Sequence, residues 1–485
     1  MSTGGRAGTT WEPVIGLEVH VQLRTERKLF CGDRVVFGDE PNTHVCPVCL
    51  GLPGALPTTN PEAVELAVRT ALALGCTVHG RSIWARKNYF YPDLPKGYQI
   101  TQLEHPLATD GVVAYEGPDG AAEVRIRRAH MEEDAGKSVH DRIPGVTAVD
   151  LNRTGTPLVE IVTEPDLRSP AGVRAFLGTL KQILEYVDVS DCNMEEGSLR
   201  VDANVSVRRR GAGELGAKTE IKNVNSFSGV ERAVEIEIER QIATLEAGGR
   251  VEQQTLLWDD HRARLRAMRS KEESHDYRYF PDPDLPPLLI PVEVVDAARE
   301  LLPELPAARR ARLMSAYGLS TYDAGVLTQS RASADYFEVV AGASGEPKAA
   351  ANWVMGPAQA LMNERKEDAS TFAVSADALA ELLALVAEGT ISDSAAKTVL
   401  GVIAAEGGRP REIVEARGLT QVRDDGQLDA WVAGAIVEHP DEVARYRGGE
   451  GKLLGFFVGQ VMKRSAGKAD PRRVNELLRK ALEAS

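Results

Sequence analysis

The sequence predicts an α+β protein in which an antiparallel-sheet cradle domain is followed by an all-α helical domain and a small α-helical tail domain. Up to about residue 290, apolar and polar residues alternate between Gly- and Pro-rich turns, which is typical of antiparallel strands with attached helices. Beyond this point apolar residues recur at three- and four-residue spacing, as in helices that bury one face. Glycine-rich turns near Gly407 and Gly448 then separate shorter helices. We expect the domains to span residues 1–291, 292–417 and 418–485.

Length and composition narrow the class of protein. The chain has 485 residues, of which 43% are hydrophobic, so two or three domains are expected rather than one. Its formal net charge of -14 gives no general attraction to polyanions, so any contact with nucleic acid must be local. Five cysteines are too few for a disulfide framework, and the sequence shows neither a secretion signal nor a membrane-length apolar run. We therefore expect a cytoplasmic protein.

The first predicted strand, residues 14–23, places polar side chains on one face. Apolar residues alternate there with polar ones, so Glu18 and His20 share a face and lie roughly 7 Å apart at a rise of about 3.3 Å per residue. A carboxylate and an imidazole in this arrangement could share one cation. For this stretch alone, an ordinary half-solvated strand is the better account.

Two further predicted strands repeat the pattern. Residues 199–207 place Asp202 on a polar face, and Glu220 and Lys222 flank Ile221 in a third strand. Acids, an imidazole and cations thus recur on the polar faces, and Mg²⁺ prefers oxygen ligands. With three such strands, a divalent metal site becomes as good an account as a plain exposed sheet.

Three consecutive acids, Glu132, Glu133 and Asp134, follow a run of arginines and could supply metal ligands and phosphate contacts. A charged turn is the alternative. The nearby Gly-Lys-Ser at 136–138 is not a phosphate-binding P-loop, because Met131 stands where that motif needs glycine. The glycines at 211–216 fall between two predicted strands, so a turn is expected there and not a dinucleotide-binding loop.

Cys46 and Cys49, preceded by Cys31, have the spacing of a zinc site. Three thiolates need a fourth ligand, for which Asp33, His44 or water are the local candidates. A structural Zn²⁺ and buried free thiols are equally good interpretations.

Two Pro-rich aromatic loops, residues 89–95 and 279–287, could stack rings on a base such as adenine, or could pack their rings beneath a rigid loop. Between Arg445 and Ser485, ten Lys and Arg residues face four Asp and Glu residues. This local excess suits contact with an RNA backbone, although on charge alone a solvated helical face explains it slightly better.

The strings VIGLEVHVQL, ARKNYFYPDLPKGYQI, HMEEDAGKS, DLNRTGTPLVEIVTEPD, SDCNMEEGSLRVDANVSV and TEIKNVNSF resemble, in order, the B subunit of the bacterial three-subunit glutamyl/aspartyl-tRNA amidotransferase. The resemblance runs from Trp11 to the C-terminus, where the sequence is similar to the small tRNA-binding tail domain of that family. It implies an ATP-dependent carbon–nitrogen ligase that phosphorylates the side-chain carboxylate of Glu-tRNA(Gln) or Asp-tRNA(Asn) and amidates it. The ammonia is expected from a glutaminase A subunit, with a small C subunit completing a heterotrimer.

The resemblance also implies site residues. The Mg²⁺ ligands are expected to be Glu18, His20, Glu132, Glu133, Asp202 and Glu220. Three of these ligands are also expected to be catalytic: Glu18, His20 and Glu133. Lys222 is expected to be catalytic as well. The ATP phosphates are expected to contact Lys87 and Arg153. Zinc-bearing members have a further cysteine where Asp33 stands, and others dispense with zinc.

Two other classes of function remain open. In one, the chain is an RNA-binding scaffold and catalysis lies elsewhere, which the clustered acids argue against because carboxylates repel phosphates unless a metal intervenes. In the other, it is a stand-alone ATP-dependent ligase that uses free ammonia, which purification and assay of the chain alone would test.

Overall fold

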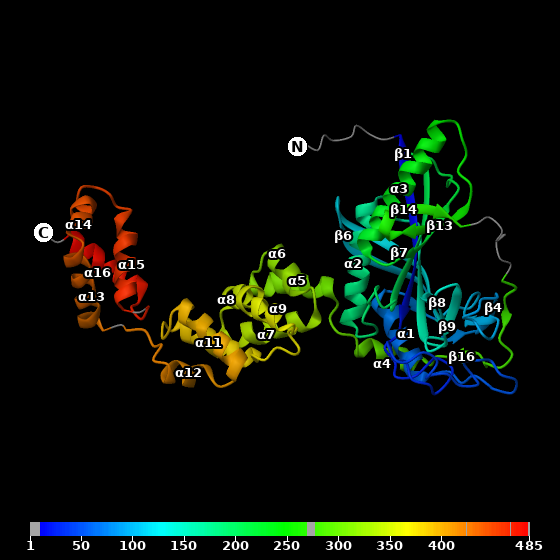
Figure 1. Ribbon diagram of the computed structural model, residues 1–485, viewed down its shortest axis with the longest axis horizontal. Helices are drawn as coiled ribbons and strands as arrows, with labels where there is room; N and C mark the ends of the chain where they lie inside the picture. Colours follow the sequence, from blue (N-terminus) through cyan, green and yellow to red (C-terminus); the bar gives the residue numbers. More distant parts are fainter. Residues whose placement is uncertain (1–9, 269–276, 423, 466, 484–485) are drawn as a thin grey trace. The chain divides into compact units, whose positions relative to one another are not determined.

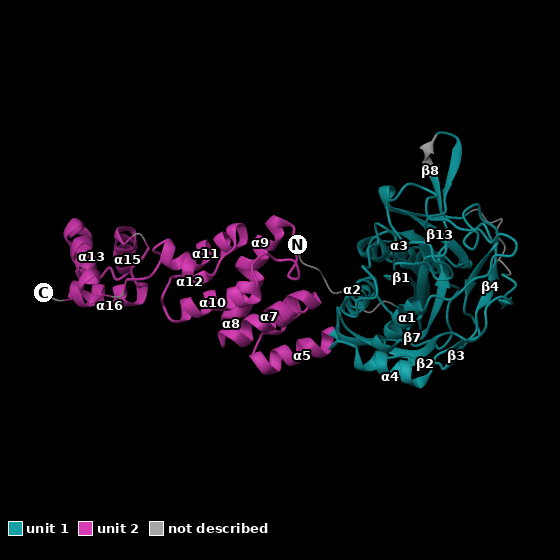
Figure 2. Ribbon diagram, turned by 90° about the horizontal axis from the view of Figure 1, so that it is seen from below, with its two compact units in different colours: residues 1–305 teal, residues 306–485 magenta. Residues whose placement is uncertain are grey.

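The computed structural model describes residues 10–268, 277–422, 424–465 and 467–483, and the chain divides into two compact units, residues 1–305 and 306–485 (Figures 1 and 2). The expectation that the N-terminus carries no secretion signal falls mostly on residues outside the described ranges. Within the described parts of the chain, every helix is too short or too polar to cross a membrane.

A nine-stranded sheet dominates the first unit, with the strand order β14-β13-β12-β11-β1-β10-β7-β6-β2. The pairs are antiparallel except for β12 and β13, which run parallel. Its strands are β1 (Trp11–Gln22), β2 (Thr77–Val78), β6 (Ala108–Gly117), β7 (Gly120–Glu133), β10 (Pro157–Thr163), β11 (Leu199–Arg209), β12 (Thr219–Val224), β13 (Gln254–Asp259) and β14 (Arg264–Ala267). The three polar-faced strands expected from the sequence are confirmed as β1, β11 and β12.

The two faces of the sheet differ because the central strands alternate. In β1, Ile15, Leu17, Val19 and Val21 are fully buried and join the main hydrophobic core. Three long helices supply the rest of that core: α1 (Pro61–Ala73), α2 (Pro170–Tyr186) and α3 (Phe227–Glu246). Helices α2 and α3 pack on each other, α2 contacts β6 and α3 contacts β11 (Figure 1). The polar residues of β1 therefore project from the opposite face.

Short strands bring distant segments beside that sheet. Strands β4 (Ala85–Asn88), β5 (Tyr98–Thr101) and β15 (Phe280–Pro281) form a three-stranded sheet, with β4 in the middle. Strand β3 (Arg81–Ser82) pairs with β16 (Leu288–Leu289), and β8 (Lys137–Ile143) pairs with β9 (Val146–Asp150). The pairing of β4 with β15 joins the two aromatic loops that were recognised separately in the sequence.

The described residues of the second unit form helices joined by turns and loops, with an isolated bridge between Val422 and Ala469. Its α-helices are α5 (Pro306–Tyr317), α6 (Thr321–Leu327), α7 (Arg331–Ser344), α8 (Pro347–Trp353), α9 (Gln359–Arg365), α10 (Ala376–Ala387), α11 (Asp393–Glu406), α12 (Pro410–Ala416), α13 (Asp425–Glu438), α14 (Pro440–Arg447), α15 (Leu453–Arg464) and α16 (Pro471–Glu483). Its buried apolar residues form two clusters, one from Leu313 to Val414 and one from Leu428 to Leu482. The predicted α+β class, with a sheet domain followed by helical regions, is confirmed.

One helix falls on the other side of the expected first boundary. Helix α4 (Val292–Glu300), which the sequence places in the helical domain, belongs to the first unit, and its Ala298 is buried in the same core as β1. The first unit ends at Leu305 because the apolar face of α4 packs against α1. The separate tail domain at 418–485 remains a prediction.

Candidate functional site

The functional face is built from β1 and its two neighbours. Glu18 lies directly opposite Asp202 of β11, while His20 lies between Glu160 of β10 and Arg200 of β11. These positions follow from strand register, because residues two apart on a strand share a face and register fixes their cross-strand neighbours. Polar groups from strands that are far apart in sequence therefore meet on one surface.

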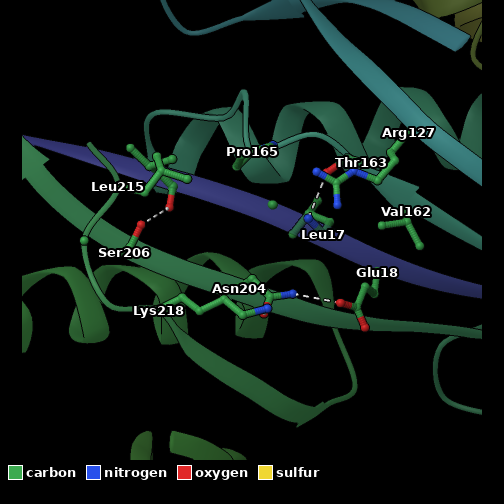
Figure 3. Close-up of a pocket in the computed structure, with 13 residues that line it drawn as sticks. Leu17, Glu18, Arg127, Val162, Thr163, Pro165, Asn204, Ser206, Leu215 and Lys218 are labelled. Atoms are coloured by element: carbon green, nitrogen blue, oxygen red, sulfur yellow. Dashed lines mark hydrogen bonds between the residues drawn. The ribbon is translucent and has the colours of Figure 1, made fainter. Parts of the chain in front are cut away.

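Three acids form the first group, here called the three-carboxylate group: Glu18, Asp202 and Glu220. One oxygen of each lies within 4.8 Å of the others. The Lys222 ammonium lies between two of them, with Nζ 2.8 Å from Asp202 Oδ2 and 3.0 Å from Glu220 Oε1. The side-chain amide of Asn204 donates to Glu18 Oε1 at 3.0 Å (Figure 3). A cation is thus already accommodated between these oxygens.

The electrostatics of this group show an excess of negative charge around Glu18. Burial raises the pKa of the Glu18 carboxyl, and the nearby carboxylates of Glu160, Glu220 and Asp202 raise it further. Burial alone would lower the pKa of Lys222, but the carboxylates of Asp202 and Glu220 outweigh it and raise that pKa. Lys222 is therefore an ammonium at neutral pH, and a further positive charge near Glu18 would be favourable.

The second group, here called the histidine group, consists of His20, Glu132 and Glu160. Nε2 of His20 lies 3.3 Å from Glu132 Oε1 and 3.8 Å from Glu160 Oε2, and one ligand atom of each residue lies within 4.8 Å of the others. The buried His130 supports the group from β7, with Nε2 3.0 Å from Glu160 Oε2. Both glutamates are almost completely buried.

Ion pairing dominates the protonation of the histidine group. Burial disfavours the His20 imidazolium, but hydrogen bonding to Glu132 and the charges of both glutamates outweigh it and raise the pKa of His20 to about 9. Burial would likewise raise the pKa of Glu160, yet the two histidines hold it well below its usual range. Without a metal, the group is therefore an imidazolium between two carboxylates, and a bound metal must displace the His20 proton.

The structure divides the expected ligands between two groups. Glu18 belongs to the three-carboxylate group and His20 to the histidine group, so we expect each of them to serve its own cation. Glu133 joins neither group: its side chain points away from Glu132 and forms a buried ion pair with Lys96, while its Oε1 accepts from the Ile100 amide at 2.9 Å. Its catalytic role stays a prediction without geometric support.

Glu160 belongs to the histidine group, and sequence reasoning missed it as a candidate ligand. It is 8% exposed within the run Pro157–Thr163, most of whose residues are buried. The signal in the sequence was a lone acid inside an apolar strand, because a carboxylate is rarely buried without a charged or metal partner.

Lys87 and Arg153, the expected phosphate contacts, differ in their surroundings. Burial lowers the pKa of Lys87, but the charges of Glu132 and Glu160 and nearby tyrosines outweigh it and raise that pKa. The ammonium lies over the Tyr277 ring, with Nζ 4.9 Å from its centre. Arg153 instead holds the β7–β8 connection, donating to Ala135 O at 3.0 Å and to Gly136 O at 2.6 Å. Two of its five N–H donors are used in these bonds, so its expected phosphate contact stays a prediction.

The thiol cluster is a third candidate metal site, separate from the sheet. Cys31, Cys46 and Cys49 converge with Asp33, whose carboxylate thereby becomes the fourth donor. Cys49 Sγ lies 3.4 Å from Cys31 Sγ and 3.0 Å from Asp33 Oδ2. His44 lies outside this group, and its Nε2 lies 2.7 Å from Asp39 Oδ2. Oxygen and thiolate donors in this number suit Zn²⁺.

With these two groups, the sheet face can hold two hard divalent cations side by side. The donors are carboxylate oxygens and one imidazole, the set that binds Mg²⁺ or Mn²⁺ in phosphate-handling sites. This surface favours added positive charge, because the Lys222 ammonium already lies beside Asp202 and the pKa of the Glu18 carboxyl is raised.

Comparison with known proteins matches this architecture. Residues 13–296 match the family described as the GatB/GatE catalytic domain, and residues 335–482 match the family described as the GatB domain. The sheet unit with its acidic groups thus defines a GatB/GatE-type catalytic chain. Similar chains include the B subunit of aspartyl/glutamyl-tRNA(Asn/Gln) amidotransferase from Moorella thermoacetica, 54% identical over 97% of this chain and 100% of the relative. The corresponding chain of Geotalea daltonii is 53% identical over 98% of this chain and 99% of the relative.

Myxococcus xanthus has another such B subunit, 50% identical over 97% of this chain and 98% of the relative. The chain belongs to the family of aspartyl/glutamyl-tRNA(Asn/Gln) amidotransferase B subunits. The resemblance inferred from the sequence is confirmed.

Proposed function

We propose that this chain catalyses the ATP-dependent amidation of the side-chain carboxylate of Glu-tRNA(Gln), of Asp-tRNA(Asn), or of both. The observation that supports this most strongly is the pair of ligand groups on one sheet face. Mg²⁺ bound there by the three-carboxylate group and the histidine group would neutralise charge on a transferring phosphoryl group. The family supports the same reaction, since its members are named as tRNA amidotransferase subunits.

The reaction needs two steps, because a free carboxylate resists attack by ammonia. First, an oxygen of the substrate carboxylate attacks the γ-phosphorus of ATP, the bond to the β-phosphate oxygen breaks and ADP leaves. Ammonia then attacks the acyl carbon of the acyl phosphate. The bond between that carbon and the bridging oxygen breaks, inorganic phosphate leaves, and the nitrogen loses one proton to give the amide. Positioning and electrostatics are the main contributions that a protein can make to such a transfer.

The lysines of the site serve as cations in this proposal. Carboxylate neighbours raise the pKa values of Lys222 and Lys87 against the effect of burial, so neither is a base at neutral pH. Lys222, beside the three-carboxylate group, and Lys87, whose pKa the carboxylates of Glu132 and Glu160 raise, would donate to phosphoryl oxygens. His130 orients Glu160, and Arg200 orients Asp134 with Nη2 3.0 Å from Asp134 Oδ2.

The ammonia and the tRNA require partners. We propose that ammonia is supplied by a glutaminase A subunit, that a small C subunit completes a heterotrimer, and that the mischarged tRNA contacts residues 418–485. Arg464 and Arg473 of this region already pair with acids of the same region. The phosphate contacts would therefore fall to other basic residues of the region, among them Lys463, Lys468 and Arg472. The cytoplasmic location stays a prediction.

The test is an assay of the reconstituted three-subunit complex with each mischarged tRNA, ATP, Mg²⁺ and either glutamine or ammonium. Amide formation that requires ATP and is abolished by Glu18→Ala or His20→Ala, with tRNA affinity retained, is the expected result. Unchanged turnover in both variants would overturn the proposal. Full activity of the isolated chain with ammonium alone would instead indicate a stand-alone ligase.

A further inference from the structure

Three thiols meet in the segment that precedes α1, apart from the sheet face that carries the two ligand groups. Cys49 Sγ lies 3.4 Å from Cys31 Sγ and 3.8 Å from Cys46 Sγ. Asp33 completes the cluster and accepts a hydrogen bond from Cys49 Sγ at 3.0 Å. A carboxylate cannot take part in a disulfide, so any sulfur–sulfur bond in this cluster must join two of the three thiols.

The shorter of these two sulfur contacts joins Cys31 and Cys49. To form a disulfide, the two sulfurs would have to approach each other by about 1.4 Å. Residues 35–60, which carry Cys49, form turns, bends and loops, so the approach need not break a helix or a sheet ladder. Cys31 is half-buried and open to a small oxidant, whereas Cys49 is buried and shielded from it. Cys31 is therefore the thiol that an oxidant reaches first, and Cys49 the neighbour that can react with it.

We propose that Cys31 and Cys49 form a reversible disulfide when hydrogen peroxide reaches the zinc-free cluster, and that this disulfide slows amidation. Peroxide transfers one oxygen to Cys31 Sγ to give a sulfenic acid, its O–O bond breaks, and its other oxygen leaves as water. Cys49 Sγ then attacks the Cys31 sulfur, the S–O bond breaks, and the hydroxyl group leaves as water with the proton of Cys49. The thiols are oxidised to the disulfide and the peroxide is reduced to water. The disulfide itself does not depend on the proposed function, but its effect on amidation rests on that function.

Lys28 connects the thiol cluster to the end of β7. This lysine is completely buried, and its Nζ lies 3.4 Å from Cys49 Sγ. Gly155 separates the Lys28 side chain from Glu133, because a Cβ at Gly155 would lie 3.5 Å from Lys28 Cδ and 3.9 Å from Glu133 Oε2. The disulfide uses the sulfur that Lys28 contacts. Because a buried polar group is costly to leave without a partner, the Lys28 side chain is expected to shift when the disulfide forms.

A second lysine connects the same loop to Glu133. Lys96 and Glu133 form a buried ion pair, and the Lys96 side chain packs on Gly51, two residues after Cys49. The fit is close, because a Cβ at Gly51 would lie 2.6 Å from Lys96 Cγ. Glu133 adjoins Glu132, which belongs to the histidine group. A displacement of the loop around Cys49 therefore reaches the histidine group through an unbroken series of contacts.

The test treats the reconstituted three-subunit complex with a zinc-selective chelator and then with hydrogen peroxide, after which free thiols are alkylated. Peptide mass spectrometry is expected to find Cys31 joined to Cys49. Cys76 and Cys192 are internal controls, because both are buried in the main core and should remain thiols. Amidation is expected to fall roughly tenfold, because small displacements near a reacting group slow it strongly, and to recover with dithiothreitol.

Cys31→Ser and Cys46→Ser are a matched pair, because each removes one thiol from the cluster. Peroxide should leave the rate of the Cys31→Ser complex at its own untreated value, whereas the Cys46→Ser complex should still form the disulfide and lose rate. Comparing treated with untreated complex for each variant also removes the effect of thiols in the partner subunits.

Three results would overturn the inference: no Cys31–Cys49 peptide in the oxidised wild type, an unchanged rate after that disulfide has formed, or an equal loss of rate in Cys31→Ser. Failure of the untreated complex to form any amide would refute the proposed function and with it the effect on amidation. Mass spectrometry alone would then decide whether the disulfide forms.

Discussion

Glu18 and His20 project from the same face of β1 but belong to different groups of candidate metal ligands. Glu18 meets Asp202 and Glu220 on one side, and His20 meets Glu132 and Glu160 on the other. One strand thus contributes a candidate ligand to each of two adjoining groups, and its two-residue repeat sets their spacing.

Because the groups are separate, each should be removable without the other. His20→Ala is expected to abolish one of two Mn²⁺ sites per chain and to leave the site at Asp202 intact, whereas Glu18→Ala should do the reverse. Isothermal titration of Mn²⁺ measures both stoichiometries. Glu123→Ala, which removes an exposed acid of β7, is the control. Loss of both sites in either single variant would mean that the residues form one site.

His130 is expected to act by holding Glu160. Its Nε2 lies 3.0 Å from Glu160 Oε2, so His130→Phe should free that carboxylate and weaken Mn²⁺ at the histidine group roughly 10- to 100-fold. The three-carboxylate group should keep its affinity, which separates this effect from general loss of structure. Unaltered Mn²⁺ affinity in a folded His130→Phe chain would remove the supporting role.

Metal binding at the histidine group should depend on pH. The pKa of His20 is raised to about 9, so the metal-free imidazole is protonated at pH 7 and must lose its proton to bind. Affinity is expected to rise from pH 7 to about 9 and then to level off, with proton release visible as a dependence of titration heat on the buffer. Binding at pH 7 without proton release would contradict this.

The same pKa has the opposite effect on the metal-free fold. Because it is raised above the ordinary value of about 6.5, the stability contributed by charged His20 is complete below pH 6.5. That stability is lost as the pH rises through about 9. In chelator-treated protein, Tm should therefore fall across this interval more in wild type than in His20→Phe. A parallel fall in both chains would show that other groups are responsible.

Asp33 should decide the zinc affinity of the thiol cluster. Asp33→Cys supplies the softer thiolate and is expected to bind Zn²⁺ more tightly than wild type, while Asp33→Ala binds it less tightly. Competition with a chromophoric chelator gives the order of affinities, and amidation is expected to be unchanged in Asp33→Cys. Equal zinc affinity in all three chains would exclude Asp33 as a ligand.

Charge removal in the C-terminal helices should weaken tRNA binding. Lys463→Gln with Lys468→Gln is expected to lower affinity and to reduce the slope of log K against log salt by about one for each phosphate that the protein no longer neutralises. Filter binding at several salt concentrations measures this. Lys397→Gln, in α11, serves as the control. An unchanged slope in the double variant would place the tRNA contacts elsewhere.

Much of this site could be predicted from the sequence, because strand alternation is a local property. The period of two in β1, β11 and β12 identified Glu18, His20, Asp202 and Glu220 as residues of polar strand faces. Helical periodicity likewise identified the region beyond about residue 290 as helical, where α4 to α16 lie.

What the sequence could not supply is register between distant strands. The pairing of His20 with Glu160 depends on how β10 lies against β1, and no local pattern fixes that alignment. The same limit explains Glu133: at the end of β7 its side chain faces Lys96 instead of Glu160, which only the course of the β4–β5 connection determines. Tertiary packing likewise places α4 in the first unit, although the helical spacing of its apolar residues assigned it to the helical domain.

The most direct test of the central claim is a crystal structure of the complex soaked with Mn²⁺ and a non-hydrolysable ATP analogue, with anomalous scattering locating the metal. Two peaks are expected, one among Glu18, Asp202 and Glu220 and one among His20, Glu132 and Glu160, with the triphosphate beside them. Ordered triphosphate on this face with no anomalous peak at either group would contradict the account.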